Sequence, residues 1–378
     1  MEDSRIRRLA QTIIQFATQT KVGDRILLEQ HGGQDFSLLK ALIQEAYAVG
    51  AKPYYSITQR DLEAELIRGA DLPHMREFTQ YEIERMKAMD VYVDIRVDEN
   101  LFAWNGLPSE GLDAYYRGYW GPLHMDLRTQ STRWTVLYYP TQATAQLAGM
   151  NLSDFEDFFF DSTLVTYEKM GRAMQPLVEL MHKTDQVKII APGTDLQFSI
   201  KNIGIMAMHG NRNLPDGEIY TAPIRESVNG TIRYNIDSRY QDFVFKDVSF
   251  VFKNGKIVEA SANDNKRLNR ILDTDEGARY IGEFAIGVNP MITKGITNII
   301  YDEKMSGSFH LTPGNCYNNA ENGNKSSIHW DLIQSQRPEH GGGQIFFDGK
   351  CIRDNGVFIP ESLQGLNPEN LLENNLSR

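Results

Sequence analysis

The stretch RILLEQHGGQDFSLLKALIQEAYAVGAKPYYSI, residues 25–57, decides the fold of the first part of the chain. It holds a short apolar run at 25–29, a pattern of helical period at 36–49 and a second short run at 53–57. Short runs of this kind are typical of buried strands, whereas a longer run with a period near 3.6 residues is typical of a helix. A strand, a helix and a strand in succession predict two parallel strands joined by a right-handed crossover.

The same alternation continues on both sides of this stretch. The further predicted elements are helices at 4–20, from about 62 and at 79–89, and strands at 91–97 and 134–139. Strands separated by helices favour a parallel sheet. The sequence therefore predicts an α/β N-terminal domain over residues 1–152 with a mainly parallel sheet.

The pattern changes after a predicted helical connection at residues 153–185. From there on, short β runs alternate with turns rich in Gly, Asn and Asp. The pairs Asn254-Gly255 and Asp348-Gly349, each placed between β runs, are typical of hairpins. The sequence thus predicts a β-rich α+β C-terminal domain over residues 186–378.

Composition limits the classes of protein that fit this chain. Its 378 residues are enough for two domains, and 39 Lys+Arg against 50 Asp+Glu give a net charge of −11. That charge, with no basic cluster, argues against a nucleic-acid partner. No run approaches the ~20 apolar residues of a membrane span, and the charged N-terminus is unlike a secretory signal. Two cysteines, Cys316 and Cys351, cannot form a disulfide framework, so we expect a cytoplasmic protein.

A group of potential metal ligands lies late in the chain. His329 and Asp331 fall in residues 327–333, which we predict to be a strand, so their side chains point to the same face. His310 lies upstream and is followed by a turn and, seven residues on, by Tyr317. Two imidazoles and a carboxylate suit Zn, Fe, Mn or Co. The sequence therefore predicts a metal site.

Two glutamates stand in an unusual local context, since Glu218 and Glu283 each follow a glycine. Glycine permits close backbone approach and can direct a glutamate from a turn into a cleft. From these residues alone, however, we favour plain turn glutamates without a function. Five other histidines have no ligand-type partner at a suitable spacing, and we expect them to be surface or structural residues: His31, His74, His124, His182 and His209.

The order of these segments resembles the aminopeptidase T (thermophilic metalloaminopeptidase) family. The resemblance rests on NLPDGEIYTAP at 213–223, GARYIGE at 277–283, a His with a Tyr seven residues later, and His-x-Asp at 329–331. It implies an exopeptidase that acts on short peptides, forms a homodimer and binds two divalent ions (Zn, Co, Mn or Mg) in its C-terminal domain. The implied metal ligands are Glu218, Glu283, His310, His329 and Asp331.

The residue roles follow from this resemblance and from the chemistry of the side chains. Glu283 is expected to bridge the two ions and to act in catalysis, and a water between them would be made acidic. Tyr317 falls at the family's active-site tyrosine and could donate a hydrogen bond to the tetrahedral oxyanion. Its alternative role is packing against His310.

The same residues are compatible with other functions. His310, His329 and Asp331 alone would form the facial triad of an iron(II) enzyme, as in ring-cleaving dihydroxypyridine dioxygenases, which resemble this peptidase family. The two glutamates favour the two-metal hydrolase, because a one-iron oxygenase does not need them. A binding protein without catalysis is a third possibility. The aromatic cluster at residues 104–120 is expected either to form a packed loop or to line a substrate path or a subunit contact.

Overall fold

A computed structural model describes residues 3–241 and 243–372. The chain divides into two compact units, the first made of Met1–Leu164 and Gly210–Pro215 and the second of Val165–His209 and Asp216–Arg378. The short return of segment 210–215 to the first unit has no counterpart in the sequence pattern. Within the described residues, no helix has the length and apolar character needed to cross a membrane.

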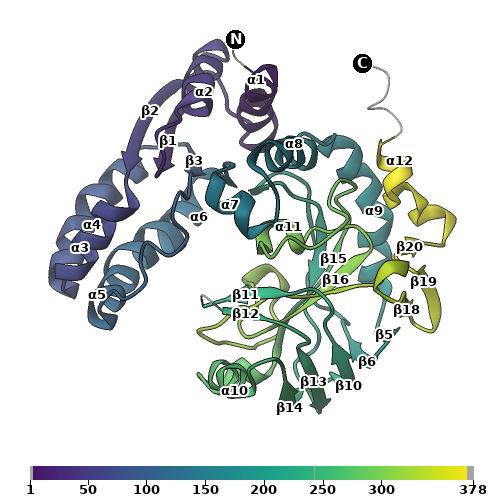
Figure 1. Cartoon of the computed structure of the whole chain (residues 1–378). Coiled ribbons are helices and arrows are strands. Elements are labelled where there is room, and N and C mark those ends of the chain that lie inside the picture. Colours follow the sequence, from purple (N-terminus) through teal and green to yellow (C-terminus); the bar gives the residue numbers. More distant parts are fainter. Residues whose placement is uncertain (1–2, 242, 373–378) are drawn as a thin grey trace. The chain divides into compact units, whose positions relative to one another are not determined.

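The first unit is an α/β structure around a parallel sheet of five strands (Figure 1). Strand β1 spans Arg25–His31. Six of its seven residues are buried or partly buried, as expected for a strand covered on both faces. The mainly parallel sheet predicted from residues 25–57 is confirmed. In spatial order the strands are β2 (Lys52–Thr58), β1 (Arg25–His31), β3 (Val91–Arg96), β4 (Arg133–Tyr138) and β8 (Asn213–Leu214).

Helices fill the connections between these strands. Their apolar faces carry the core, as in the second helix, where Leu38, Leu42 and Ala46 recur at helical spacing and are buried. The α-helices are α1 (Ser4–Gln11), α2 (Ser37–Ala48), α3 (Arg60–Gly69), α4 (Leu72–Lys87), α5 (Ser109–Tyr115), α6 (Thr129–Ser131), α7 (Gln142–Leu147) and α8 (Leu152–Thr163). Two π-helical segments continue α1 and α5, at Thr12–Ala17 and Tyr116–Arg128.

The second unit is β-rich, as predicted, and its sheets are antiparallel. It begins with helix α9 (Tyr167–Lys183) and contains an eight-stranded, a five-stranded and a two-stranded sheet. The eight-stranded sheet has the order β14 (Lys256–Ser261), β13 (Ser249–Lys253), β10 (Asn229–Arg233), β6 (Thr194–Ser199), β5 (Gln186–Ala191), β18 (Gln344–Phe347), β19 (Lys350–Asp354) and β20 (Val357–Phe358). The small sheet pairs β11 (Ser238–Tyr240) with β12 (Phe243–Phe245), and the helices are α10 (Asn265–Leu272), α11 (Ile299–Asp302) and α12 (Pro368–Leu372).

Both predicted hairpins are present. Asn254-Gly255 joins β13 to β14 and Asp348-Gly349 joins β18 to β19, and all four residues have positive φ angles between 46° and 82°. Two consecutive positive φ angles define the tight turn whose twist matches that of the strands it joins. Asn, Asp and Gly tolerate this conformation best, which is why the sequence pattern is informative here.

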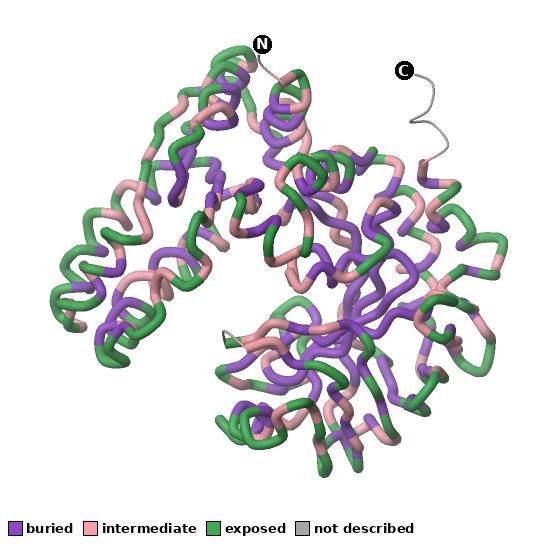
Figure 2. Tube along the Cα trace, viewed as in Figure 1, coloured by how far each residue is buried: buried purple, intermediate pink, exposed green. Residues whose placement is uncertain are grey.

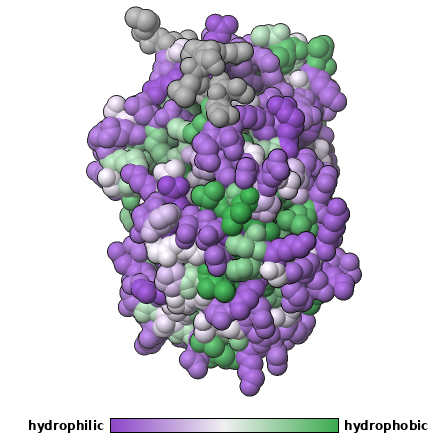
Figure 3. Space-filling model, turned by 90° about the vertical axis from the view of Figure 1, so that its right-hand side faces the viewer, coloured by the Kyte–Doolittle hydropathy of each residue, from purple (hydrophilic) through white to green (hydrophobic). Residues whose placement is uncertain are grey.

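The five-stranded sheet forms the centre of the second unit. Its order is β17 (Leu332–Ser335), β16 (Ser308–Pro313), β15 (Ile281–Gly287), β9 (Glu218–Thr221) and β7 (Met206–Met208). Every residue of β15, β16 and β9 is buried, and these strands are purple in Figure 2. Hydrophilic residues dominate the face shown in Figure 3, where apolar ones gather in small patches. A charged side chain on the central strands is therefore far from water and needs a compensating partner.

Candidate metal centre

The register of the central sheet brings three of the predicted ligands to one face. Glu218 lies opposite Gly287, and His310 lies opposite Ala285 on the strand that also carries Glu283. Directly opposed residues project to the same face, and so do residues two apart on one strand. Because Gly287 and Ala285 have little or no side chain, the space in front of the sheet is left to the carboxylates and the imidazole.

The glycine before each glutamate permits a close approach of backbone, as predicted. A Cβ on Gly282 would lie 2.3 Å from the carbonyl oxygen of Asn315, and a Cβ on Gly217 would lie 3.0 Å from Asn289. The expected turn is wrong, however, since Glu218 begins β9 and Glu283 lies inside β15. Gly217 lies just before β9, whereas Gly282 is the second residue of β15.

His329 and Asp331 reach the site from irregular backbone. The strand predicted at 327–333 is wrong, because β17 begins only at Leu332 and His329 forms an isolated bridge to Gly314. Pro313 ends the neighbouring strand and has no N–H to extend the ladder. The two side chains nevertheless lie together, with His329 Nε2 3.4 Å from Asp331 Oδ1.

The five predicted ligands converge on Glu283. Its Oε1 lies 3.4 Å from His310 Nε2, and its Oε2 lies 3.2 Å from His329 Nε2. Among the described residues, two groups offer ligand atoms within 4.8 Å of one another: Glu218, Glu283 and His310, and Glu283, His329 and Asp331. Glu283 is the member common to both groups.

The imidazole of His329 is held in an orientation that suits metal binding. Its Nδ1 lies 2.8 Å from the carbonyl oxygen of Asn315, an acceptor that requires the proton on Nδ1. In the neutral form that binds a metal, Nε2 then has the lone pair, which faces Glu283 and Asp331. Thr312 supports the second carboxylate, since its hydroxyl donates to Asp331 Oδ1 at 2.5 Å.

One carboxylate oxygen of the site lacks the partner that a bound cation would supply. Oε2 of Glu218 is buried, lies 3.7 Å from His310 Nε2 and has no hydrogen-bond donor among the described residues. A buried carboxylate oxygen without a donor is costly, and a divalent ion is the partner that such an oxygen and an imidazole share. The residues present therefore fit a bound metal.

Burial and closely spaced charges shift the pKa values of the candidate ligands. Burial alone would lower the pKa of His310, but the hydrogen bond to Glu283 and the charge of Asp331 outweigh it and raise the pKa to about 9. Burial alone would raise the pKa of Asp331, but the charge of His329 holds that pKa well below its usual range. Ligating imidazoles must be neutral, so metal binding releases these protons.

A buried lysine next to the site was not found from the sequence. Nζ of Lys304 lies 2.6 Å from Glu218 Oε1 and 2.8 Å from Glu303 Oε1, with Asp216 Oδ1 at 3.6 Å. Its side chain is 1% exposed. No motif or period marks Lys304 in the sequence, and only its position beside β9 reveals it. It balances part of the negative charge and holds Glu218 in place.

Tyr317 lies at the accessible edge of this cluster. Its ring centroid is 4.8 Å from that of His329 and 5.5 Å from that of Tyr220, and the residue is 45% exposed. Tyr220 is fixed in turn by a hydrogen bond to Asn319 Oδ1 at 3.0 Å. The phenol of Tyr317 is thus accessible from solvent while its ring is supported by two others.

The first unit contains two features considered from the sequence, His31 and the aromatic cluster at 104–120. His31, expected to have no ligand-type partner at a suitable spacing, lies 3.7 Å from Glu29 on its own strand, 3.5 Å from Asp94 on β3 and 3.7 Å from Glu63 on α3. The aromatic cluster at 104–120 is largely packed against α3 and α4. It includes Tyr115, which is 8% exposed.

Comparison with known proteins adds the family. Residues 2–350 match the sequence profile of the family described as thermophilic metalloprotease (M29). The chain belongs to this family. Membership makes it a metal-dependent peptide-bond hydrolase, in agreement with the donor set above.

Relatives of this M29 protein carry aminopeptidase names. Aminopeptidase 2 of Geobacillus stearothermophilus is 24% identical over 332 residues, covering 76% of this chain and 78% of that one. Aminopeptidase PepS of Streptococcus thermophilus is 24% identical over 377 residues, covering 85% and 88%. Aminopeptidase T of Thermus thermophilus is 27% identical over 260 residues, covering 58% and 63%.

Solved structures share the fold of this M29 protein. Wild-type AmpT from Thermus thermophilus has a TM-score of 0.79 at 20% identity and covers 94% of this chain and 99% of its own. A 2,5-dihydroxypyridine dioxygenase from Pseudomonas putida KT2440 has a TM-score of 0.62 at 14% identity and covers 95% and 99%. The fold alone therefore does not distinguish hydrolase from oxygenase.

Proposed function

We propose that this protein is a metalloaminopeptidase that removes N-terminal residues from short peptides. Its five metal ligands would be Glu218, Glu283, His310, His329 and Asp331. The observation that carries the proposal is the position of Glu283, whose two carboxylate oxygens face two different imidazoles at 3.4 and 3.2 Å. A carboxylate placed in this way suits a bridge between two cations.

Each side chain of the site would have its own role in the reaction. Two bound divalent ions would polarise the scissile carbonyl and make a water acidic. Glu218 and His310 would hold one ion, His329 and Asp331 the other, and Glu283 both. Tyr317, beside His329 and exposed, would donate a hydrogen bond to the oxygen that gains charge in the transition state. The carboxylates would also hold the α-ammonium group of the peptide near the ions.

The oxygenase alternative uses only part of this site. His310, His329 and Asp331 could bind one iron(II), but Glu283 then lies against both imidazoles without a role. A facial triad leaves the remaining positions of the iron open for oxygen and substrate, and two further ligands, the carboxylates of Glu218 and Glu283, would fill them. The geometry therefore favours the hydrolase.

We infer further properties from the same resemblance. The domain at 186–378, which contains all five proposed ligands, would carry the catalysis, and the domain at 1–152 would restrict access to short peptides. We expect a cytoplasmic homodimer that uses Zn, Co, Mn or Mg. Sedimentation of the purified protein tests the dimer, and a monomer at all concentrations would refute it.

Activity with defined metals tests the reaction. The chelator-stripped protein is given leucyl-p-nitroanilide and other aminoacyl-p-nitroanilides, with Co, Zn, Mn, Mg or Fe(II) restored in turn under air and under argon. We expect release of p-nitroaniline that depends on metal and is independent of oxygen. If no substrate is hydrolysed, and oxygen is consumed with Fe(II) and a dihydroxylated aromatic compound, the protein is the oxygenase instead.

Metal stoichiometry tests the bridging role. Titration calorimetry should find two ions per chain in the wild type, one in Glu218→Gln and one in Asp331→Asn, whereas Glu283→Gln should weaken both. Glu321→Gln, a change at an exposed residue of the same unit, serves as the control. A Glu283→Gln variant that still binds two ions with full affinity would exclude the bridge.

A further inference from the structure

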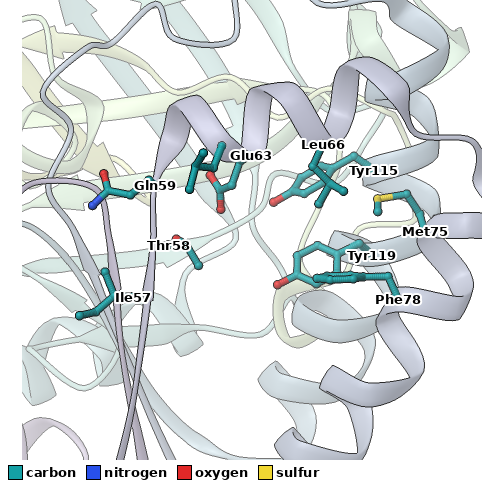
Figure 4. A pocket seen from close by; sticks show the side chains of 10 residues that line it. Ile57, Thr58, Gln59, Glu63, Leu66, Met75, Phe78, Tyr115 and Tyr119 are labelled. Atoms are coloured by element: carbon teal, nitrogen blue, oxygen red, sulfur yellow. The ribbon is translucent and has the colours of Figure 1, made fainter.

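The first unit contains a pocket of about 250 Å³ that the proposed peptidase reaction does not use. It lies between the end of β2, helices α3 and α4, and the aromatic residues at 115–119 (Figure 4). Ile57 and Leu62 are 42% and 67% exposed, so the pocket is open to solvent on their side. Its lining residues are Ile57, Thr58, Gln59, Leu62, Glu63, Leu66, Met75, Phe78, Tyr115 and Tyr119.

Glu63 is the single charged residue in this lining. Figure 4 shows its carboxylate directed into the pocket. Burial alone would raise the pKa of Glu63, but the hydrogen bond and charge of His31 and the charge of Arg60 outweigh it and lower the pKa. The carboxylate is therefore ionised at neutral pH. With no cationic residue in the lining, the pocket disfavours an anion.

The partners of Glu63 leave it able to bind a further donor. Arg60 donates one hydrogen bond to Oε2 at 3.3 Å, and His31 Nδ1 lies 3.7 Å from Oε1. His31 has closer contacts of its own, with Thr58 Oγ1 at 2.7 Å and Asp94 Oδ1 at 3.5 Å. A carboxylate has about four acceptor positions, so about two of those of Glu63 remain open beside Arg60 and His31.

Two phenols add neutral polar groups to the pocket. The hydroxyl groups of Tyr115 and Tyr119 point into it in Figure 4, and neither has a hydrogen-bond partner within residues 3–241 and 243–372. Burial raises the pKa of both, so they stay uncharged. Their rings are fixed by packing, with Tyr115 5.2 Å from Trp104 and Tyr119 5.6 Å from Phe78 between centroids.

The rest of the lining is apolar. Leu66, Met75 and Phe78 form one wall and Ile57 lies across from them (Figure 4). A wall of this kind stabilises an aliphatic or aromatic body, and the edge of an aromatic ring suits the methionine sulfur. The volume of about 250 Å³ suits one compact group.

We propose that this pocket binds a primary ammonium group carried on a compact apolar or aromatic body. Glu63 accepts the charge, Tyr115 and Tyr119 accept further N–H groups, and the apolar wall holds the body. An ammonium has three donors, which matches one carboxylate and two phenols. Both a free amine and the first residue of a peptide have this chemistry.

Binding of small amines to the full-length, metal-free protein tests the proposal. Removal of metal inactivates the candidate centre in the other unit, so the probes are not hydrolysed. The probes are phenethylamine, phenylalaninamide, N-acetylphenylalaninamide, which lacks the charge, and 3-phenylpropionate, an anion. Calorimetry gives Kd, and the ¹³C-methyl resonance of Met75, assigned by its loss in Met75→Leu, locates the ligand. We expect the two amines to bind with Kd of about 1 mM or tighter and to shift this resonance.

Matched variants separate the pocket from other sites. Glu63→Gln should weaken amine binding by at least about tenfold, because a charged hydrogen bond is lost. Glu65→Gln, on the exposed face of the same helix, should leave Kd unchanged. Tyr119→Phe keeps the shape of the ring and should weaken binding several-fold, which keeps the test valid if Glu63→Gln fails to fold.

The outcomes are distinct. Tighter binding of phenylalaninamide than of phenethylamine would identify the first residue of a peptide as the ligand, and the reverse order a free amine. The proposal is overturned if the acetylated or anionic probe binds as tightly as the amines, if Met75 does not respond, or if Glu63→Gln binds like the wild type. None of these results depends on peptidase activity.

Discussion

Nζ of Lys304 lies 2.6 Å from Oε1 of Glu218, and both residues are buried. The same ammonium contacts Glu303 at 2.8 Å. One lysine therefore compensates carboxylates on both sides of it. The charge balance of the candidate centre depends on this residue as well as on any bound metal.

Lys304→Met is expected to destabilise the metal-free protein by roughly 3–5 kcal/mol, because it leaves buried carboxylates without their partner. Urea unfolding of the chelator-stripped protein measures this change. Divalent ions should restore part of the loss, since they supply positive charge to Glu218. Lys188→Met, which removes an exposed lysine 3.5 Å from Asp195, is the control and should have little effect. Equal stability of the two variants would contradict this role of Lys304.

Thr312 is expected to tune metal binding through Asp331. Thr312→Val removes the hydroxyl that donates to Asp331 Oδ1 at 2.5 Å while it preserves shape. Supporting hydrogen bonds of this kind are worth roughly 10–100-fold in metal affinity or activity. Calorimetry with Zn or Co should show that loss, and Thr312→Ser should recover most of it. A valine variant with wild-type affinity would show that Asp331 needs no support.

Gly282 is expected to be required for the position of His329. A Cβ at residue 282 would lie 2.3 Å from the carbonyl oxygen of Asn315, which accepts the Nδ1 proton of His329. Gly282→Ala should therefore cost roughly 1–3 kcal/mol of stability and weaken metal binding as well. Gly69→Ala meets no atom within 4 Å and, like Gly282, has no positive φ angle, so it controls for the substitution of glycine by alanine without the close approach. Unchanged metal affinity in Gly282→Ala would refute the coupling.

His124 is expected to make the folded protein sensitive to acid. Burial and then the charge of Arg128 lower its pKa from 6.5 to about 4. The unfolded chain takes up this proton at a higher pH than the folded one, so the stabilising contribution is present above pH 6.5 and is lost as the pH falls toward 4. The change corresponds to roughly 3 kcal/mol at about 1.4 kcal/mol per pH unit.

Urea unfolding between pH 6.5 and 4.5 measures this loss. His124→Phe, which suits the aromatic contacts with Tyr92 and Tyr119, should give a shallower decline than the wild type. His182→Gln, at an exposed position in α9, should decline like the wild type. Identical slopes in all three proteins would mean that other groups govern the acid response.

The sequence by itself determined the fold class, the tight hairpins and the residues proposed as ligands. Hydrophobic period and turn chemistry act over a few residues, so RILLEQHGGQDFSLLKALIQEAYAVGAKPYYSI is sufficient to predict a parallel strand pair. Glycine before Glu218 and Glu283 signalled close backbone approach for the same local reason.

Only the tertiary structure decided how these residues meet. The shared position of Glu283 follows from pairing between β15 and β16, and His329 reaches it from backbone that Pro313 keeps out of a regular ladder. Lys304 meets Glu218 across 86 residues of chain and His31 meets Asp94 across 63, in addition to acidic neighbours close by in sequence. Such contacts leave no periodic trace in the sequence, because the partner of a buried charge is set by packing in space and not by spacing along the chain.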